Sequence, residues 1–269
     1  MPTPAIRPTA VAGTFYPAEA DVLKLQVNEF LKIADETRAV ALPTSPPKAI
    51  IAPHAGYVYS GPIAASVYAR LRPWHDVIKR VILIGPSHRV PFEGLATSSA
   101  GYFTTPLGNI PLDRDAIQQT LSLTQVSELD EAHRLEHSLE VHLPFLQQVL
   151  DNFTLVPLVF GRTQAESIDE VLELFWNDPE TLIVVSSDLS HFHDYEEASV
   201  MDQLAAQAIG ELAPQELTSE QACGQLAIQA LLLVAKRYDR QPTLLDLRNS
   251  GDTAGTKDRV VGYGAFEFR

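Results

Sequence analysis

Histidines stand close behind three of the apolar segments in this sequence, where buried strands are expected to end. They are His54, His88 and His191, and Asp188 precedes the last of them by three residues. The carboxyl ends of parallel strands meet at one edge of a sheet, so we expect these side chains to share a site. Imidazole and carboxylate groups are the usual ligands of zinc and of non-haem iron. The pattern therefore predicts a metal or catalytic site.

Each of these residues also has a plain structural interpretation. A single histidine after a strand is often a hydrogen-bonded loop residue, and Asp188 could cap a following helix, since aspartate is a preferred N-cap. If Asp188 and His191 lie on one helical turn, their spacing makes them face the same way. The recurrence of histidine after three separate segments is what favours a shared site.

A second group of candidates lies in the segment 136–142, which reads EHSLEVH. His137, Glu140 and His142 are its possible ligands, and the spacing of the acidic residues Glu136 and Glu140 is helical. It does not match the HExxH zinc signature. Acidic residues also suit the first turn of a helix, where they meet the positive end of the helix dipole. From spacing alone, this structural interpretation is the favoured one.

Two further positions complete the chemical inventory. Asp252 lies in the segment NSGDTAG, which is either a turn or a ligand-facing loop. Cys223 is the one cysteine, so neither an intrachain disulfide nor an all-cysteine metal site can form. It falls in the apolar, helix-like stretch EQACGQLAIQALLL, and we expect a buried, inert thiol there.

The elements that would position these residues alternate between strands and helices. Strands are expected at 49–52, 80–84, 154–160, 182–185 and 259–268, and helices at 18–34, 63–71, 143–150, 165–176, 196–209 and 219–238, with Ser219 as N-cap of the last. This alternation predicts an α/β layered fold with a largely parallel sheet, or a mixed one if the closing segment is an edge or hairpin strand. The candidate residues span most of the chain, which favours a single domain over 1–269.

Composition narrows the possible partners. The 269 residues carry a net charge of −14, which disfavours binding to nucleic acid or to an anionic membrane surface. The longest apolar stretch, 226–235, is too short to span a bilayer, and the N-terminus has no signal-peptide apolar region. We expect a soluble, cytoplasmic protein.

Six segments in order resemble the Memo family, whose prokaryotic members are often called AmmeMemoRadiSam system protein B. They read AVAGTFYPA, IAPHAGYVYSGPIAA, ILIGPSH, EHSLEVHLPFLQ, VVSSDLSHF and NSGDTAG…VVGYGAFEF. The resemblance implies a three-layer α/β/α fold similar to the LigB-type class III extradiol dioxygenases, which are non-haem Fe(II) enzymes.

The resemblance also assigns roles by motif. His54 and His88 match the two metal-binding histidines, His191 matches the acid/base histidine, and Asp188 lies in the same motif. Animal Memo proteins place a cysteine in the late segment as third ligand, whereas NSGDTAG here has none. The third ligand is then Asp252, Asp188, His191 or water. A carboxylate would favour Fe(II), and zinc or copper are the alternatives.

Three functions follow from this resemblance and the residues. The first is a non-haem iron-dependent, dioxygenase-like oxidoreductase. The alternative is a non-catalytic accessory protein that binds a metal or a peptide and works with radical-SAM and AMMECR-type proteins. The third, with the least support, is a metal-assisted hydrolase in which His191 and Asp188 assist a zinc-bound water.

Overall fold

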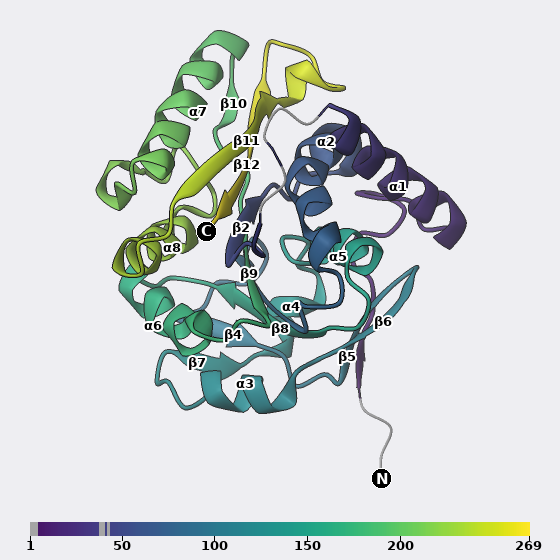
Figure 1. The fold of residues 1–269 in the computed structure, drawn as a ribbon, viewed down its shortest axis with the longest axis vertical. Coiled ribbons are helices and arrows are strands. Elements are labelled where there is room, and N and C mark those ends of the chain that lie inside the picture. The colour runs from purple at the N-terminus through teal and green to yellow at the C-terminus, as the bar shows by residue number, and fades with distance from the viewer. Residues whose placement is uncertain (1–4, 38–40, 42–43) are drawn as a thin grey trace.

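A mixed central sheet organises the chain (Figure 1), which is described here by a computed structural model covering residues 5–37, 41 and 44–269. In order across the sheet, the strands are β10 (His191–His193), β12 (Val260–Phe268), β2 (Ala49–Ala52), β9 (Thr181–Ser186), β3 (Arg80–Pro86), β8 (Thr154–Phe160), β4 (Leu95–Thr97) and β7 (Val126–Glu128), and β11 (Pro242–Asn249) also pairs with β12. The four strands β2, β9, β3 and β8 are mutually parallel, and β12 runs antiparallel to β2.

Helices cover both faces of this sheet and make the outer two layers. Figure 1 shows α1 (Ala20–Glu36), α2 (Tyr57–Tyr68) and α5 (Leu143–Val149) on one side, and α6 (Ala165–Trp176), α7 (Tyr195–Gly210) and α8 (Gln225–Arg237) on the other. Shorter elements are α3 (Arg114–Thr120), α4 (Asp130–Arg134), four 3₁₀ turns (Ala69–Trp74, Glu140–His142, Pro214–Glu216 and Ser250–Asp252) and a small sheet of β1 (Ile6–Arg7), β5 (Tyr102–Thr105) and β6 (Gly108–Pro111). The expected α/β/α architecture is confirmed.

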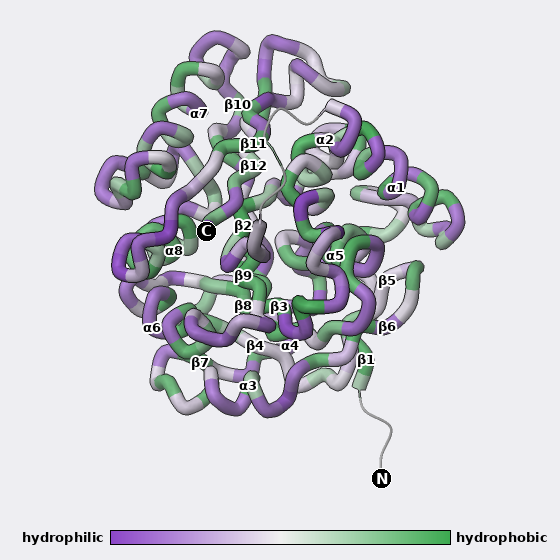
Figure 2. Tube along the Cα trace, in the orientation of Figure 1, coloured by the Kyte–Doolittle hydropathy of each residue, from purple (hydrophilic) through white to green (hydrophobic). Residues whose placement is uncertain are grey.

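The central strands form because their residues are apolar on both faces. Every residue of β2 and β9 is buried, as a strand between two helical layers requires. The hydrophobic colours gather along these strands in Figure 2, and the outer helices alternate between the two colours. In α6, Ile168, Val171, Leu172 and Phe175 are buried at helical spacing.

Most expected elements are confirmed, with bounds that shift by a residue or two, and 154–160 and 165–176 match β8 and α6. Helix α2 begins at Tyr57, six residues before the expected start, and runs through Pro62. A proline there leaves the carbonyl of Val58 without its helical N–H partner. Val58 is 57% exposed, so water can reach this side of the helix.

Two expectations near the candidate site were wrong. Helix α8 begins at Gln225 with Gly224 as its N-cap, so Ser219 is not the cap and Cys223 lies in the turn before the helix. Residues 187–190 form no helical turn, and His191 opens strand β10 instead.

The closing strand is not an edge. β12 lies inside the sheet and pairs antiparallel with β2, β10 and β11, which makes the sheet mixed. In the parts of the chain that the structure describes, no helix combines the length and apolar character needed to cross a membrane.

Candidate metal centre

Three neighbouring parallel strands deliver the first candidates to one edge of the sheet. Ala52 of β2 pairs with Ser186 of β9, and β3 lies on the other side of β9. His54, Asp188 and His88 follow the carboxyl ends of these strands, as the sequence predicted.

The ring of His54 is held in one tautomer by a serine. Its Nδ1 lies 2.6 Å from Ser186 Oγ, and that hydroxyl donates its only proton to the carbonyl of Ser138 at 2.6 Å. Ser186 must therefore accept a hydrogen bond from Nδ1–H of His54. The Nε2 lone pair is left free, and the side chain is buried at 2% exposure.

A buried carboxylate fixes His88 in the same way. Its Nδ1 lies 2.9 Å from Glu136 Oε1, and a carboxylate only accepts, so Nδ1 carries the proton. Glu136 also accepts from the backbone N–H groups of His88, His137 and Ser138, at 2.5, 2.9 and 2.9 Å. Burial raises the pKa of Glu136, but the His88 imidazole and these N–H groups outweigh it and lower the pKa to about 2.

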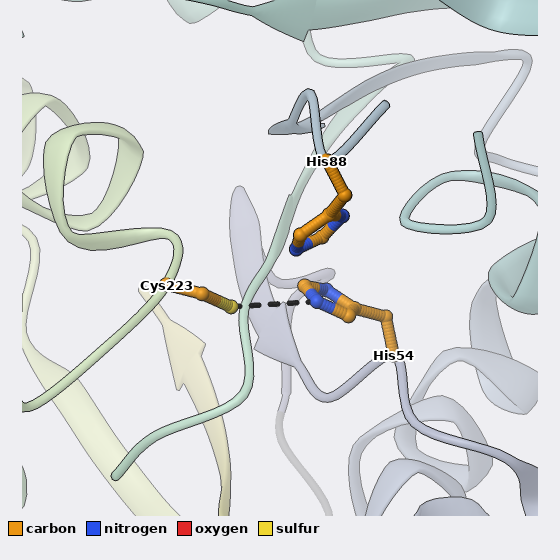
Figure 3. A group of neighbouring side chains, drawn as sticks. All are labelled: His54, His88 and Cys223. Atoms are coloured by element: carbon orange, nitrogen blue, oxygen red, sulfur yellow. Dashed lines mark hydrogen bonds between the residues drawn. The ribbon is translucent and has the colours of Figure 1, made fainter. Parts of the chain in front are cut away.

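Cys223 reaches the two histidines from the opposite side. Figure 3 shows its side chain pointing at the ring of His54, and Sγ lies 3.3 Å from His54 Nε2. The turn can come this close because the next residue is Gly224. A Cβ there would lie 2.5 Å from the Cβ of Ser187 and 2.7 Å from the carbonyl oxygen of Ser186.

His54, His88 and Cys223 each place one ligand atom within 4.8 Å of the others. The two imidazole rings lie 5.2 Å apart and nearly perpendicular. Cys223 was not among the third-ligand candidates taken from the sequence, which were Asp252, Asp188, His191 and water. The expected helical setting of Cys223 was wrong, because the residue lies in a turn that folds back over the end of β9, whereas its raised pKa agrees with the expected inert thiol.

A sequence model of the family described as Memo-like protein matches residues 7–267. The chain belongs to the Memo family. It is 34% identical over 283 residues to a MEMO1 family protein of Sulfurisphaera tokodaii, covering 98% of this chain and 99% of that protein. It is also 34% identical to MEMO1 family proteins of Ignicoccus hospitalis, with 98% of each chain covered, and of Sulfolobus acidocaldarius, with 98% and 99% covered. These names state membership and no activity.

In this Memo-family protein burial favours the neutral forms of His54 and Cys223. Burial lowers the pKa of His54, and the neighbouring imidazoles lower it further. Burial also raises the pKa of Cys223 to about 12, and the nearby Asp188 adds to the rise. A divalent cation would reverse this preference, because it stabilises a thiolate and competes with protons for imidazole lone pairs.

Asp188 and His191 lie beside the cluster. The Asp188 carboxylate accepts from the backbone N–H of His54 at 2.7 Å, so it anchors the turn that presents that ligand and does not cap a helix. Burial raises the pKa of Asp188 to about 7, against the lowering effect of that N–H and of His88. Burial lowers the pKa of His191, and His88 is close enough to lower it further.

His137 also belongs to the cluster. Its ring stacks on His88 at 4.7 Å and meets His54 edge-on at 5.6 Å. Nδ1 of His137 is buried and lies 3.3 Å from Glu136 Oε1, in a geometry that makes no hydrogen bond. With His88 and Glu136 it forms a second group of atoms within 4.8 Å, but Glu136 already accepts four hydrogen bonds there. We therefore assign Glu136 to positioning.

The other three candidates serve the scaffold. The buried carboxylate of Glu140 binds the N-terminal segment, accepting from Arg7, Tyr16 and two backbone N–H groups. His142 bonds the hydroxyl of Tyr68 in the core. Asp252 accepts from the Tyr195 hydroxyl at 2.6 Å and from the backbone N–H of Asn249 in a capping box.

A cavity of about 550 Å³ lies elsewhere, between α1, α2 and β11. It shares no lining residue with the histidine cluster. Its polar groups already bind one another, because Asp246 accepts from Ser66 and from Arg248. The chemistry of this molecule is therefore concentrated at the edge of the sheet, away from this hollow.

Two residues of the site escaped sequence reasoning. Ser186 sits inside an apolar strand, and its role depends on a carbonyl 48 residues away in sequence. The Cys223-Gly224 pair did carry a signal, since a glycine directly after the single cysteine indicates a close backbone approach.

Proposed function

We propose that this protein is a metal-dependent oxidoreductase whose metal is held by His54, His88 and Cys223. The observation that carries the proposal is the convergence of two imidazole nitrogens, each with its lone pair fixed inward, on one cysteine sulfur. Such preset ligands lose little entropy on binding, and hydrogen bonds to the other ring nitrogen are characteristic of metal-ligating histidines.

The donor set suits a first-row transition metal. Imidazole binds iron, copper and zinc, and a thiolate disfavours the hard ions magnesium and calcium. The likeness to LigB-type dioxygenases supports Fe(II), with zinc or copper as alternatives. Three protein ligands leave positions open, and a metal bound there would supply a Lewis acid or a redox partner for substrate.

The residues around the ligands support proton handling. Asp188, with its pKa raised to about 7, can hold or release a proton near neutral pH. His191 presents an imidazole from a different element and is the second acid/base group. Glu136 and Ser186 hold the ligand tautomers and take no part in proton transfer to substrate.

An accessory role remains the second candidate, in which the same centre binds metal without turnover and the protein works with radical-SAM and AMMECR-type proteins. A hydrolase would use the same ligands with zinc. The metal that is bound and the presence of turnover separate these functions.

The test is metal content by plasma mass spectrometry on protein purified anaerobically without chelators. We expect near-stoichiometric metal in the wild type, and a loss of roughly 10-fold or more in affinity for the added metal in Cys223→Ser. A matched control is His75→Ala, since His75 is half-exposed and bonded to Asp151 outside the cluster.

Iron in the wild type, with oxygen uptake that His191→Ala abolishes, is the result expected of an oxidoreductase. Iron or copper without turnover would favour the accessory role, and zinc with hydrolysis would favour the hydrolase. Equal metal binding by the wild type and a His54→Ala/His88→Ala double variant would refute the centre.

A further inference from the structure

Arginines in this protein are almost all engaged with carboxylates. The described part of the chain has thirteen arginines, and ten of them form ion pairs: Arg7, Arg70, Arg72, Arg80, Arg114, Arg134, Arg162, Arg237, Arg248 and Arg269. This is expected of a chain with a net charge of −14, in which carboxylates outnumber cations. An arginine without a carboxylate therefore calls for an explanation.

The three exceptions are Arg89, Arg240 and Arg259. Arg240 acts electrostatically on Lys48, at the amino end of β2 and thus at the opposite end of that strand from His54. The other two lie beside the metal centre. Arg89 directly follows the ligand His88 and is exposed, and it is close enough to His137 to lower its pKa.

Arg259 lies near His191, which is beside the cluster. It precedes β12, whose first residues pair with β10, where His191 lies. Its guanidinium lies 5.1 Å from the ring centroid of Phe192, a contact that leaves its N–H groups available. Phe192 is 62% exposed and has φ of +65°, a conformation that costs energy in a residue with a side chain. In this conformation the ring lies at the surface, 5.7 Å from the ring of His191.

Among the described residues no nearby carboxylate forms an ion pair with Arg89 or Arg259, although the charges of Asp258 and Arg259 interact. Glu136 is 1% exposed and its oxygens are occupied by four donors. Asp188 is 5% exposed and bonded to backbone. Asp258 precedes Arg259 but is hydrogen-bonded to Thr256. An approaching anion thus meets two exposed guanidinium groups that form no ion pair within the described part of the chain.

The geometry points to an anion subsite at this centre: its substrate is a small organic molecule bearing a carboxylate or phosphate group, held by Arg89 and Arg259. The inference deepens the proposed function and rests on it for the reaction, but not for the binding. Guanidinium binds both anions with paired, charge-assisted hydrogen bonds. In an acidic protein, two local cations also draw anions to this site and away from the remaining surface.

The test uses benzoate and inorganic phosphate as probes, titrated calorimetrically into the purified protein before and after chelator treatment. Benzamide has the shape of benzoate without its charge and measures the apolar contribution. We expect benzoate or phosphate to bind, benzamide to bind at least about 10-fold more weakly, and Arg89→Gln and Arg259→Gln each to weaken the anion about 10-fold. Preference for one anion identifies the carboxylate or the phosphate class.

Arg240→Gln is the matched control, because it removes an unpaired arginine away from the centre. Equal affinity for benzoate and benzamide, or Arg89→Gln and Arg259→Gln variants that bind like Arg240→Gln, would overturn the subsite. Metal content is measured on every variant. Arginine-dependent anion binding in a protein that binds no metal would keep the subsite and refute the metal centre. Metal binding without arginine-dependent anion binding would keep the metal centre and refute the subsite.

Discussion

Replacing Glu136 by glutamine separates the positioning of a ligand from the stability of the fold. In the wild type, Oε1 of Glu136 accepts three hydrogen bonds and Oε2 accepts one from the backbone N–H of His88. In Glu136→Gln the amide oxygen can keep the three hydrogen bonds that Oε1 accepts. The NH₂ group then faces the backbone N–H of His88, and two donors cannot bond each other. One donor loses its partner, at a cost of about 1–3 kcal/mol in the free energy of unfolding.

The substitution should also weaken metal binding. A neutral amide polarises the His88 imidazole less than a carboxylate does, and changes in such partners lower metal affinity by about 10–100-fold. The assay is competition with a chelator of known affinity, using Zn²⁺ or Fe²⁺ on folded protein. Circular dichroism at each metal concentration verifies that the variant is folded.

Glu140→Gln is the matched control for this prediction. Glu140 is equally buried, lies four residues along and also accepts four hydrogen bonds, but none comes from a ligand. It should lose stability with unchanged metal affinity. If both variants lose metal affinity equally, or if Glu136→Gln loses none, the positioning argument fails.

Two further predictions concern backbone approach and pH. Gly224 has φ of −90°, which any residue adopts, so Gly224→Ala acts only through the crowding at Ser187. We expect the variant to lose about 1–3 kcal/mol in the free energy of unfolding, measured with denaturant, and to bind metal more weakly. Gly210 has open space around it, so Gly210→Ala should change neither stability nor metal affinity. Burial lowers the pKa of His133 to about 4, so the unfolded chain binds more protons below pH 6.5 and stability falls as pH falls. Between pH 7 and 5 the wild type should lose about 2 kcal/mol more than His133→Gln, and an equal loss in both would contradict this.

Sequence reasoning succeeded where a segment's pattern depends on burial alone. Strands β2, β3, β8 and β9 are apolar on both faces, so their positions follow from composition, and their parallel order places His54 and His88 together. The strands β4–β7 and helices α3 and α4 were not predicted. They are three to seven residues long, and partners distant in the sequence stabilise them more than local pattern does.

The position of Cys223 beside the two histidines was not predicted, for a related reason. The apolar residues of α8 continue a helical pattern back through Cys223, but the helix starts only at Gln225. The hydrogen bond from the backbone N–H of Gly224 to Ser187 Oγ, at 2.9 Å, helps to hold the turn against β9. That tertiary contact has no counterpart in local periodicity, so the helical pattern alone could not show where the cysteine points.

The arrangement gives Asp188 a role that differs from that of a metal-binding carboxylate. One of its oxygens accepts the backbone N–H of His54, which ties the carboxylate to the turn that presents a ligand. In the usual two-histidine, one-carboxylate iron sites, the carboxylate neutralises one charge of the metal. Here the Cys223 thiolate would do so. On the proposed function, Asp188, with its pKa raised to about 7, would thereby be left to exchange protons beside the metal.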